Sequence, residues 1–267
     1  MKFLPLVALP IAFAVVFTIA ALALGDATAA AVLTTENETG KAIAGIGCLA
    51  AALAFDEGDY LRRAWLWSGV CYVVLLAGDL TGMHAVSARL SPQVLGATQA
   101  VFVVVANVAS VVGTWMLARA WSVSGLDEDD TGGRARRRAL FGGAIVAALV
   151  ITGWPLVHDT RAMVGGDVGA AVSVTSDLGD TLCLALVAPV LQTALAMRGG
   201  LLRWPWGLLA ASGVAWIVFD ASSGLLSAAH VEAGPLIVLS EASRALACAY
   251  VFSAGWAQRK IVATAAG

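Results

Sequence analysis

The chain has 267 residues, of which 60% are hydrophobic and only 13% are charged, and its formal net charge is −2. Soluble domains carry about 25% charged residues, so this composition excludes an ordinary water-exposed surface. The chain also lacks the basic tract that nucleic-acid binding requires. We therefore expect an all-α, polytopic transmembrane helix bundle and no nucleic-acid partner.

Eight apolar segments are candidates for membrane-spanning helices. They lie at residues 3–25, 40–56, 64–83, 93–118, 139–157, 168–197, 205–227 and 234–256. The second is the shortest and the weakest. The first also has the features of a signal peptide, with "ATAA" as its cleavage site. Its apolar stretch of about 22 residues has the length of a span, so we expect this segment to be retained.

Positive charges are concentrated in alternate loops, which sets the expected orientation. One set of loops and termini contains Lys2, Arg62, Arg63, Arg119, Arg134 to Arg138, Arg198, Arg203, Arg259 and Lys260. The loops on the opposite side contain fewer lysines and arginines. Both termini are therefore expected to be cytoplasmic, and we expect the protein in the inner membrane of a bacterial or archaeal cell.

The two halves of the chain resemble each other. In "RRAWLWSGVCYVVLLAGDL" the helix ends with Asp79, and in "LRWPWGLLAASGVAWIVFDAS" it ends with Asp220. The preceding helices also align, "TGKAIAGIGCLAAALAF" with "LGDTLCLALVAPVLQTALAM". The polar segment 122–138 lies between the halves and is expected to be a mobile cytoplasmic linker. We expect a tandem repeat of four plus four spans, 1–121 and 139–267, in the same orientation.

Ionisable residues gather in the outer half of the expected membrane region, whereas the inner half is almost wholly apolar. A carboxylate near the centre of a bilayer costs roughly 2.5 kcal/mol or more. We therefore expect Asp79 and Asp220 to face an outward-opening pocket with Lys41 and Arg244 as counter-charges. Other candidate lining residues at similar depth are Asp177, Asp180 and Glu241, and Asn107 lies deeper, near the middle of the fourth span. For Asp177, Glu241 and Arg244, simple pairing at helix ends is an equally good interpretation.

The cysteines and histidines give weaker signals. Cys48, Cys71, Cys183 and Cys248 lie in apolar runs without CxxC spacing, so buried free thiols are expected. His84, His158 and His230 all fall near the outer ends of helices and form a remote alternative, a metal site. Their spacing matches no metal motif, so we expect no metal and no other cofactor.

The order of these motifs resembles the YhhN family of eight-span membrane proteins, which includes lysoplasmalogenases. The matching stretches are "GKAIAG" around Lys41, "SGVCYVVLLAGDLTG" around Asp79, "LGATQAVFVVVANVASVVG" around Asn107 and "ASGVAWIVFDASSGLLSA" around Asp220. The sequence departs from the family pattern at three of these motifs. Ala42 stands where the family has proline, Asn107 where it has histidine, and Phe219 where it has serine.

The resemblance implies hydrolysis of the vinyl ether of lysoplasmalogens by aspartate general acid/base catalysis. Asp79 and Asp220 are then the catalytic residues, and the substrate-binding residues are Lys41, Asn107, Asp180, Glu241 and Arg244. The expected partner is a membrane lipid or lysolipid substrate. A homo-oligomer is also compatible with the sequence. The alternative is a small-molecule transporter or membrane sensor with an outward-open polar pocket, because parallel repeats around a polar site also occur in transporters.

Overall fold

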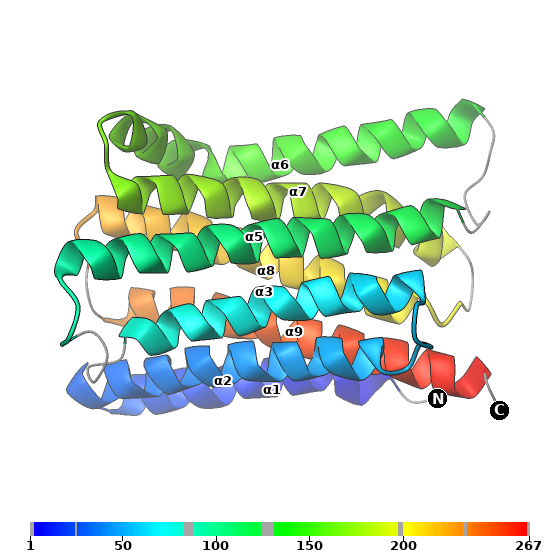
Figure 1. Ribbon diagram of the computed structural model, residues 1–267, viewed down its shortest axis with the longest axis horizontal. Coiled ribbons are helices and arrows are strands. Elements are labelled where there is room, and N and C mark those ends of the chain that lie inside the picture. Colours follow the sequence, from blue (N-terminus) through cyan, green and yellow to red (C-terminus); the bar gives the residue numbers. More distant parts are fainter. Residues whose placement is uncertain are drawn as a thin grey trace.

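The computed structural model describes residues 3–24, 26–82, 88–123, 131–196, 200–231 and 234–265. Within these ranges the chain forms eight α-helices and no strands (Figure 1). The helices are α1 Leu4–Ala23, α2 Asp26–Ala52, α3 Tyr60–Gly82, α5 Pro92–Val123, α6 Thr131–Val164, α7 Val168–Ala196, α8 Arg203–Ala228 and α9 Pro235–Ala265. The expected all-α helix bundle is confirmed.

Seven of the described helices, all except α2, are long and apolar enough to cross a membrane. Large apolar side chains on their outer faces are exposed, among them Val150 at 78% and Trp154 at 69% on α6. Such surfaces cannot be left in water over seven helices. The protein is an integral membrane protein, as its composition predicts.

Helix α2 differs from the expected second span. It begins at Asp26, so residues 26–39, between the expected first and second spans, are helical. The expected span at 40–56 starts in the second part of α2 and extends beyond its end at Ala52. The segment is rich in alanine and contains no proline, and its first glycine is Gly40, so helix propensity favours this extension. Thr34 and Thr35 add side-chain hydrogen bonds to carbonyls one turn earlier.

The linker expected at 122–138 is also helical wherever the structure describes it. Helix α5 continues to Val123, and α6 begins at Thr131. The arginine-rich run 134–138 therefore belongs to the first turns of α6. Residues 124–130 lie outside the described ranges.

Six helices form a closed ring in the order α2, α3, α5, α7, α8, α9, and α9 returns to α2. Helix α1 packs outside the ring against α9 and α2, and α6 packs on the other side against α7 and α8 (Figure 1). The N- and C-termini lie at the same end of the bundle. This end, which also contains Trp65, Trp121 and Trp206, is here named the tryptophan end. The opposite end, with Asp79 and Glu241, is named the acidic end.

Close backbone contact holds α2 against α9. A Cβ atom added to Gly255 would collide with the carbonyl of Gly47, and one added to Gly47 would collide with the backbone of Phe252. Small residues allow this approach, which is a common way to pack helices in membranes. The four cysteines are free thiols, three of them buried, as the sequence predicts.

Candidate functional site

The ring encloses a cavity of about 280 Å³, named here the chamber. All six ring helices contribute to its wall, whereas α1 and α6 contribute none of the described lining residues. Five of the seven predicted site residues line it: Lys41, Asp79, Asn107, Asp180 and Arg244. These five residues, which include all the charged residues of the described chamber wall, come from five different helices.

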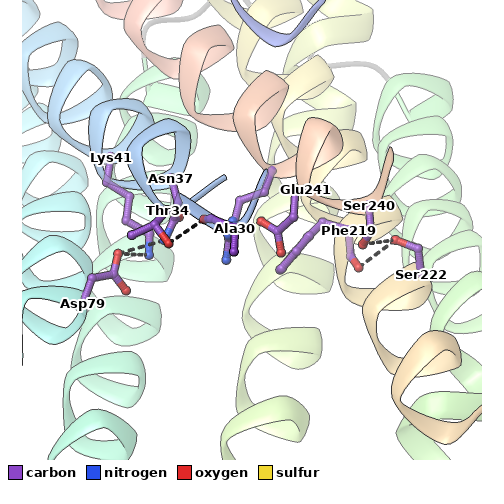
Figure 2. Close-up of polar contacts among 10 residues, drawn as sticks. Ala30, Thr34, Asn37, Lys41, Asp79, Phe219, Ser222, Ser240 and Glu241 are labelled. Carbon is purple, nitrogen blue, oxygen red and sulfur yellow. Dashed lines mark hydrogen bonds and ion pairs between the residues drawn. The ribbon is translucent and has the colours of Figure 1, made fainter. Parts of the chain in front are cut away.

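Asp79 on α3 binds two side chains of α2. Lys41 Nζ lies 2.5 Å from Asp79 Oδ2, and Asn37 Nδ2 donates to the same oxygen at 3.0 Å (Figure 2). Lys41 is only 5% exposed, which fits a cation held by a carboxylate. Both bonds use Oδ2, so no described residue binds Oδ1 of Asp79. This oxygen is free to accept a hydrogen bond from a ligand.

Asp180 on α7 and Asp220 on α8 form the second pair. Their carboxyl groups hydrogen bond to each other. Two neighbouring carboxylates in a buried site repel each other, so the pair is suited to hold one proton between its members. Asp180 is among the described lining residues of the chamber, whereas Asp220 is not. Asp220 Oδ2 is buried and has no hydrogen-bond partner among the described residues.

This arrangement corrects one expectation. We expected Asp79 and Asp220 to face the same cavity as a pair. Instead, each has its own partner from the preceding helix of its half, Lys41 and Asp180 respectively. The carboxyl groups on the chamber wall are therefore those of Asp79 and Asp180.

Arg244 on α9 forms an ion pair with Glu241 one turn earlier. Its guanidinium also lies 4.9 Å from the ring centroid of Phe219 on α8, a cation–π distance. Phe219 therefore packs against the Arg244 guanidinium. A hydrogen bond between Ser222 and Ser240, whose hydroxyl oxygens lie 2.7 Å apart, also joins α8 to α9 (Figure 2).

Two other candidates are held by the helices around them. Asn107 donates from Nδ2 to the Val103 carbonyl of its own helix, and its side chain leaves no room for a Cβ at Gly179. Asp177 is 4% exposed and lies close enough to Asp220 for their charges to interact.

Sequence reasoning missed two kinds of residue. The first is Glu36, which is 2% exposed and whose two carboxyl oxygens have no hydrogen-bond partner in the described part of the chain. The second is a set of hydroxyl residues in the chamber wall, Ser68, Tyr72, Ser110, Thr114 and Ser212. Ser68 and Tyr72 on α3 are four residues apart, and so are Ser110 and Thr114 on α5. This spacing places each pair on one helix face and was the available signal.

Asp79 also lines two other cavities. One, of about 410 Å³, lies at the acidic end and includes Asn37, Glu38, Glu241 and Arg244. The other, of about 580 Å³, is a side cavity formed mainly by α3, α5 and α7, with Gly96, Ala97 and Val172 in its wall. Asp79 therefore stands where an end cavity, a side cavity and the chamber meet.

The histidines take no part in the chamber wall that the structure describes. His158 Nδ1 lies 3.1 Å from the carboxylate of its neighbour Asp159, and His230 follows the end of α8 with a φ of 55°. His84 lies outside the described residues. No group of three described His, Cys, Asp or Glu side chains is arranged to hold a metal ion.

The sequence matches no protein-family model, and no curated protein or solved structure matches it either. Function must therefore be argued from the site itself.

Proposed function

We propose that the protein is a membrane lipid hydrolase of lysoplasmalogenase type, which cleaves the vinyl ether of a lysolipid. The observation that carries the proposal is the contrast between the two carboxyl groups on the chamber wall. Asp79 is ion-paired with Lys41, whereas Asp180 hydrogen bonds to the carboxyl group of Asp220, and such a pair is suited to hold one proton. A site with one charged and one proton-bearing carboxyl group has both a general base and a general acid.

The reaction uses these groups in turn. Asp180 donates its proton to the β-carbon of the vinyl ether, which leaves an oxocarbenium ion. Water adds to the α-carbon of that ion while Asp79 Oδ1 takes one proton from the water. The resulting hemiacetal breaks its bond to the glycerol oxygen, which takes that proton back from Asp79. The hemiacetal hydroxyl returns its proton to the Asp180–Asp220 pair, and the products are an aldehyde and an alcohol.

The cavities around Asp79 suit a lipid substrate. The side cavity has a wall of small and apolar residues, which suits lateral entry of a single chain from the bilayer. The end cavity carries Arg244 and Gln99 beside the carboxylates of Glu38 and Glu241. This mixed wall suits a zwitterionic headgroup, whose phosphate would meet Arg244 and whose ammonium would meet the carboxylates. The ether linkage between chain and headgroup then lies beside Asp79.

We also propose that the bundle arose by tandem duplication, with eight spans and both termini cytoplasmic. Four lining residues of α3, Ser68, Cys71, Tyr72 and Leu75, support this. At the sequence separation of Asp79 from Asp220, their counterparts on α8 are Leu209, Ser212, Gly213 and Trp216, and all four also line the chamber. The ring order is also unchanged when each of its helices is replaced by its counterpart in the other half.

The direct test is release of aldehyde from a lysoplasmalogen by the purified protein in detergent. Asp79→Asn and Asp180→Asn should each abolish release, because an amide can neither donate the acid proton nor accept one from water. Asp159→Asn, at a half-buried position of α6 beside His158 and outside the described chamber wall, is the matched control and should retain activity. Lack of turnover by the intact protein on several vinyl-ether lipids would contradict the proposal.

A further inference from the structure

A second cavity lies between the chamber and the tryptophan end. It measures about 150 Å³ and is named here the tryptophan pocket. Its lining residues are Leu61, Trp65, Leu117, Ala120, Trp121, Leu202, Pro205, Trp206, Leu209 and Gln258. Leu209 of α8 also lines the chamber, so the two cavities adjoin at this side chain.

The wall changes from polar to apolar along this path. Asp79, Asp180, Lys41 and Arg244 lie toward the acidic end of the chamber, and no charged side chain is among the described residues of the tryptophan pocket. Hydroxyls deeper in the chamber have protein partners. Ser68 donates to the Ala64 carbonyl, and Ser110 contacts the Cys183 thiol.

The far end of the path is closed by aromatic packing. The rings of Trp121 and Trp206 meet edge to face with their centroids 5.8 Å apart, and Trp65 is 2% exposed. Trp65 and Asp79 both lie on α3, and the distance between them along the helix axis is about 21 Å at the rise of an α-helix. A lipid chain fills one leaflet, about half of a hydrocarbon core of ~30 Å, and reaches somewhat further when extended.

We propose that the chamber and the tryptophan pocket form one blind tunnel for the alkyl chain of a single-chain lipid. The chain enters past Asp79, passes Leu209 and ends at Trp65 and Trp206, which set the longest chain that fits. A tunnel of this depth with a charged mouth and an apolar floor excludes a compact polar solute. The inference deepens the proposed hydrolase function, on which the identity of the reacting bond rests, but chain binding itself needs no hydrolysis.

Binding is therefore measured with saturated 1-O-alkyl lysolipids, which contain no vinyl ether. The probes have chains from about 12 to about 20 carbons, bracketing the length that fills one leaflet. Ligand-induced thermal stabilisation of the purified protein in detergent reports affinity. Affinity should rise with each methylene that the tunnel buries, by at most about fourfold, the value for transfer from water rather than from a detergent micelle, and stop rising beyond the chain that reaches the floor.

Two variants shorten the tunnel by independent routes. Leu209→Trp narrows the junction, and Ala120→Leu fills part of the tryptophan pocket. Each should move the limit to shorter chains while affinity for the shortest chains is retained. Leu225→Trp is the matched control for the first, because Leu225 lies on the same helix and is 49% exposed.

The outcomes separate the tunnel from the hydrolase. Length-dependent binding that both variants shorten supports the tunnel, even where the intact protein releases no aldehyde from vinyl-ether lipids. An unchanged length profile in two folded variants, or no binding of any probe by the intact protein, overturns it. Transfer of a probe from one leaflet of a vesicle to the other by the protein also overturns it, because a blind tunnel has no exit.

Discussion

Lys41 on α2 and Asp180 on α7 hold matching places in the two halves, each bonded to the aspartate of the following helix. In one half the result is an ion pair with Asp79, and in the other a carboxyl pair with Asp220. The chamber wall therefore carries two chemically different carboxyl groups, Asp79 beside a cation and Asp180 beside a second carboxyl group.

Asp180 and Asp220 should behave as one functional unit. Asp180→Asn and Asp220→Asn should each lower the rate of aldehyde release by about 10²- to 10⁴-fold, the usual contribution of a general acid. The double variant should be no slower than the slower single variant, because residues that act together are not additive. Single-turnover rates measure this. Independent roles would instead multiply the two losses.

The Lys41–Asp79 ion pair should contribute to stability only as a pair. Lys41→Met leaves Asp79 without its cation and should lower the free energy of unfolding by up to about 3 kcal/mol. Adding Asp79→Leu should restore most of that loss, because no unpaired charge then remains. Denaturant unfolding in mild detergent measures both variants.

The ion pair of the half-buried Arg62 with the exposed Glu57 is the control for this measurement. Its atoms lie 3.9 Å apart, and the Glu57 side chain is 94% exposed. Arg62→Met should change the free energy of unfolding by no more than about 0.5 kcal/mol. If Asp79→Leu instead deepened the loss of Lys41→Met, the hydrogen bond from Asn37 to Asp79 would outweigh the cost of the unpaired charge.

The orientation can be checked by labelling in a cysteine-free background. His158→Cys, with a side chain 61% exposed at the acidic end, should react with an impermeant thiol reagent added outside intact cells. Glu57→Cys, on the opposite side, should react only after the membrane is opened, because positive loops face the cytoplasm. The reversed pattern would contradict cytoplasmic termini.

The sequence predicted those features that follow from hydrophobic segments and from the cost of charge in lipid. Apolar lengths predicted an all-helical bundle, and the depth of Asp79 predicted a cation within reach, which is Lys41. The start of α2 was not predicted because its polar residues suggested a loop. In the structure Glu36 instead faces the protein interior and is 2% exposed.

Partner choice within the site was harder to predict than membership of the site. Asp79 and Asp220 hold similar places near the ends of α3 and α8, but this similarity in the sequence predicts where each aspartate lies and not which side chain it meets. The pairing of Asp180 with Asp220 depends on how α7 packs against α8. Packing of this kind arises from many small contacts that no short motif in one sequence encodes.

The contact of α2 with α9 should tolerate no added methyl group. Gly47→Ala places a Cβ against the backbone of Phe252, and backbone cannot rotate away as a side chain would. The free energy of unfolding should fall by about 1–3 kcal/mol. Gly142→Ala on α6, where nothing lies within 4 Å of the added atom, is the control. It should be neutral or stabilising, since alanine favours helix.

The buried Glu36 on α2 should lower the free energy of unfolding of the protein. Both of its carboxyl oxygens are buried, and no described residue hydrogen bonds to them. A buried polar group without a partner costs about 1–3 kcal/mol in protein variants. Glu36→Leu removes the group and keeps apolar volume, so it should raise the free energy of unfolding by an amount in this range.

Glu38→Leu serves as the control, because Glu38 is half-buried and borders the cavity at the acidic end. Its stability change should be small, since its carboxylate keeps contact with water. Glu36 lies close enough to Glu241 and Arg244 for their charges to interact, so removing it should also leave Arg244 to Glu241 alone. A loss of stability in Glu36→Leu would mean that the Glu36 carboxylate holds Arg244 in place, and binding of lysolipid headgroups would then weaken together with stability.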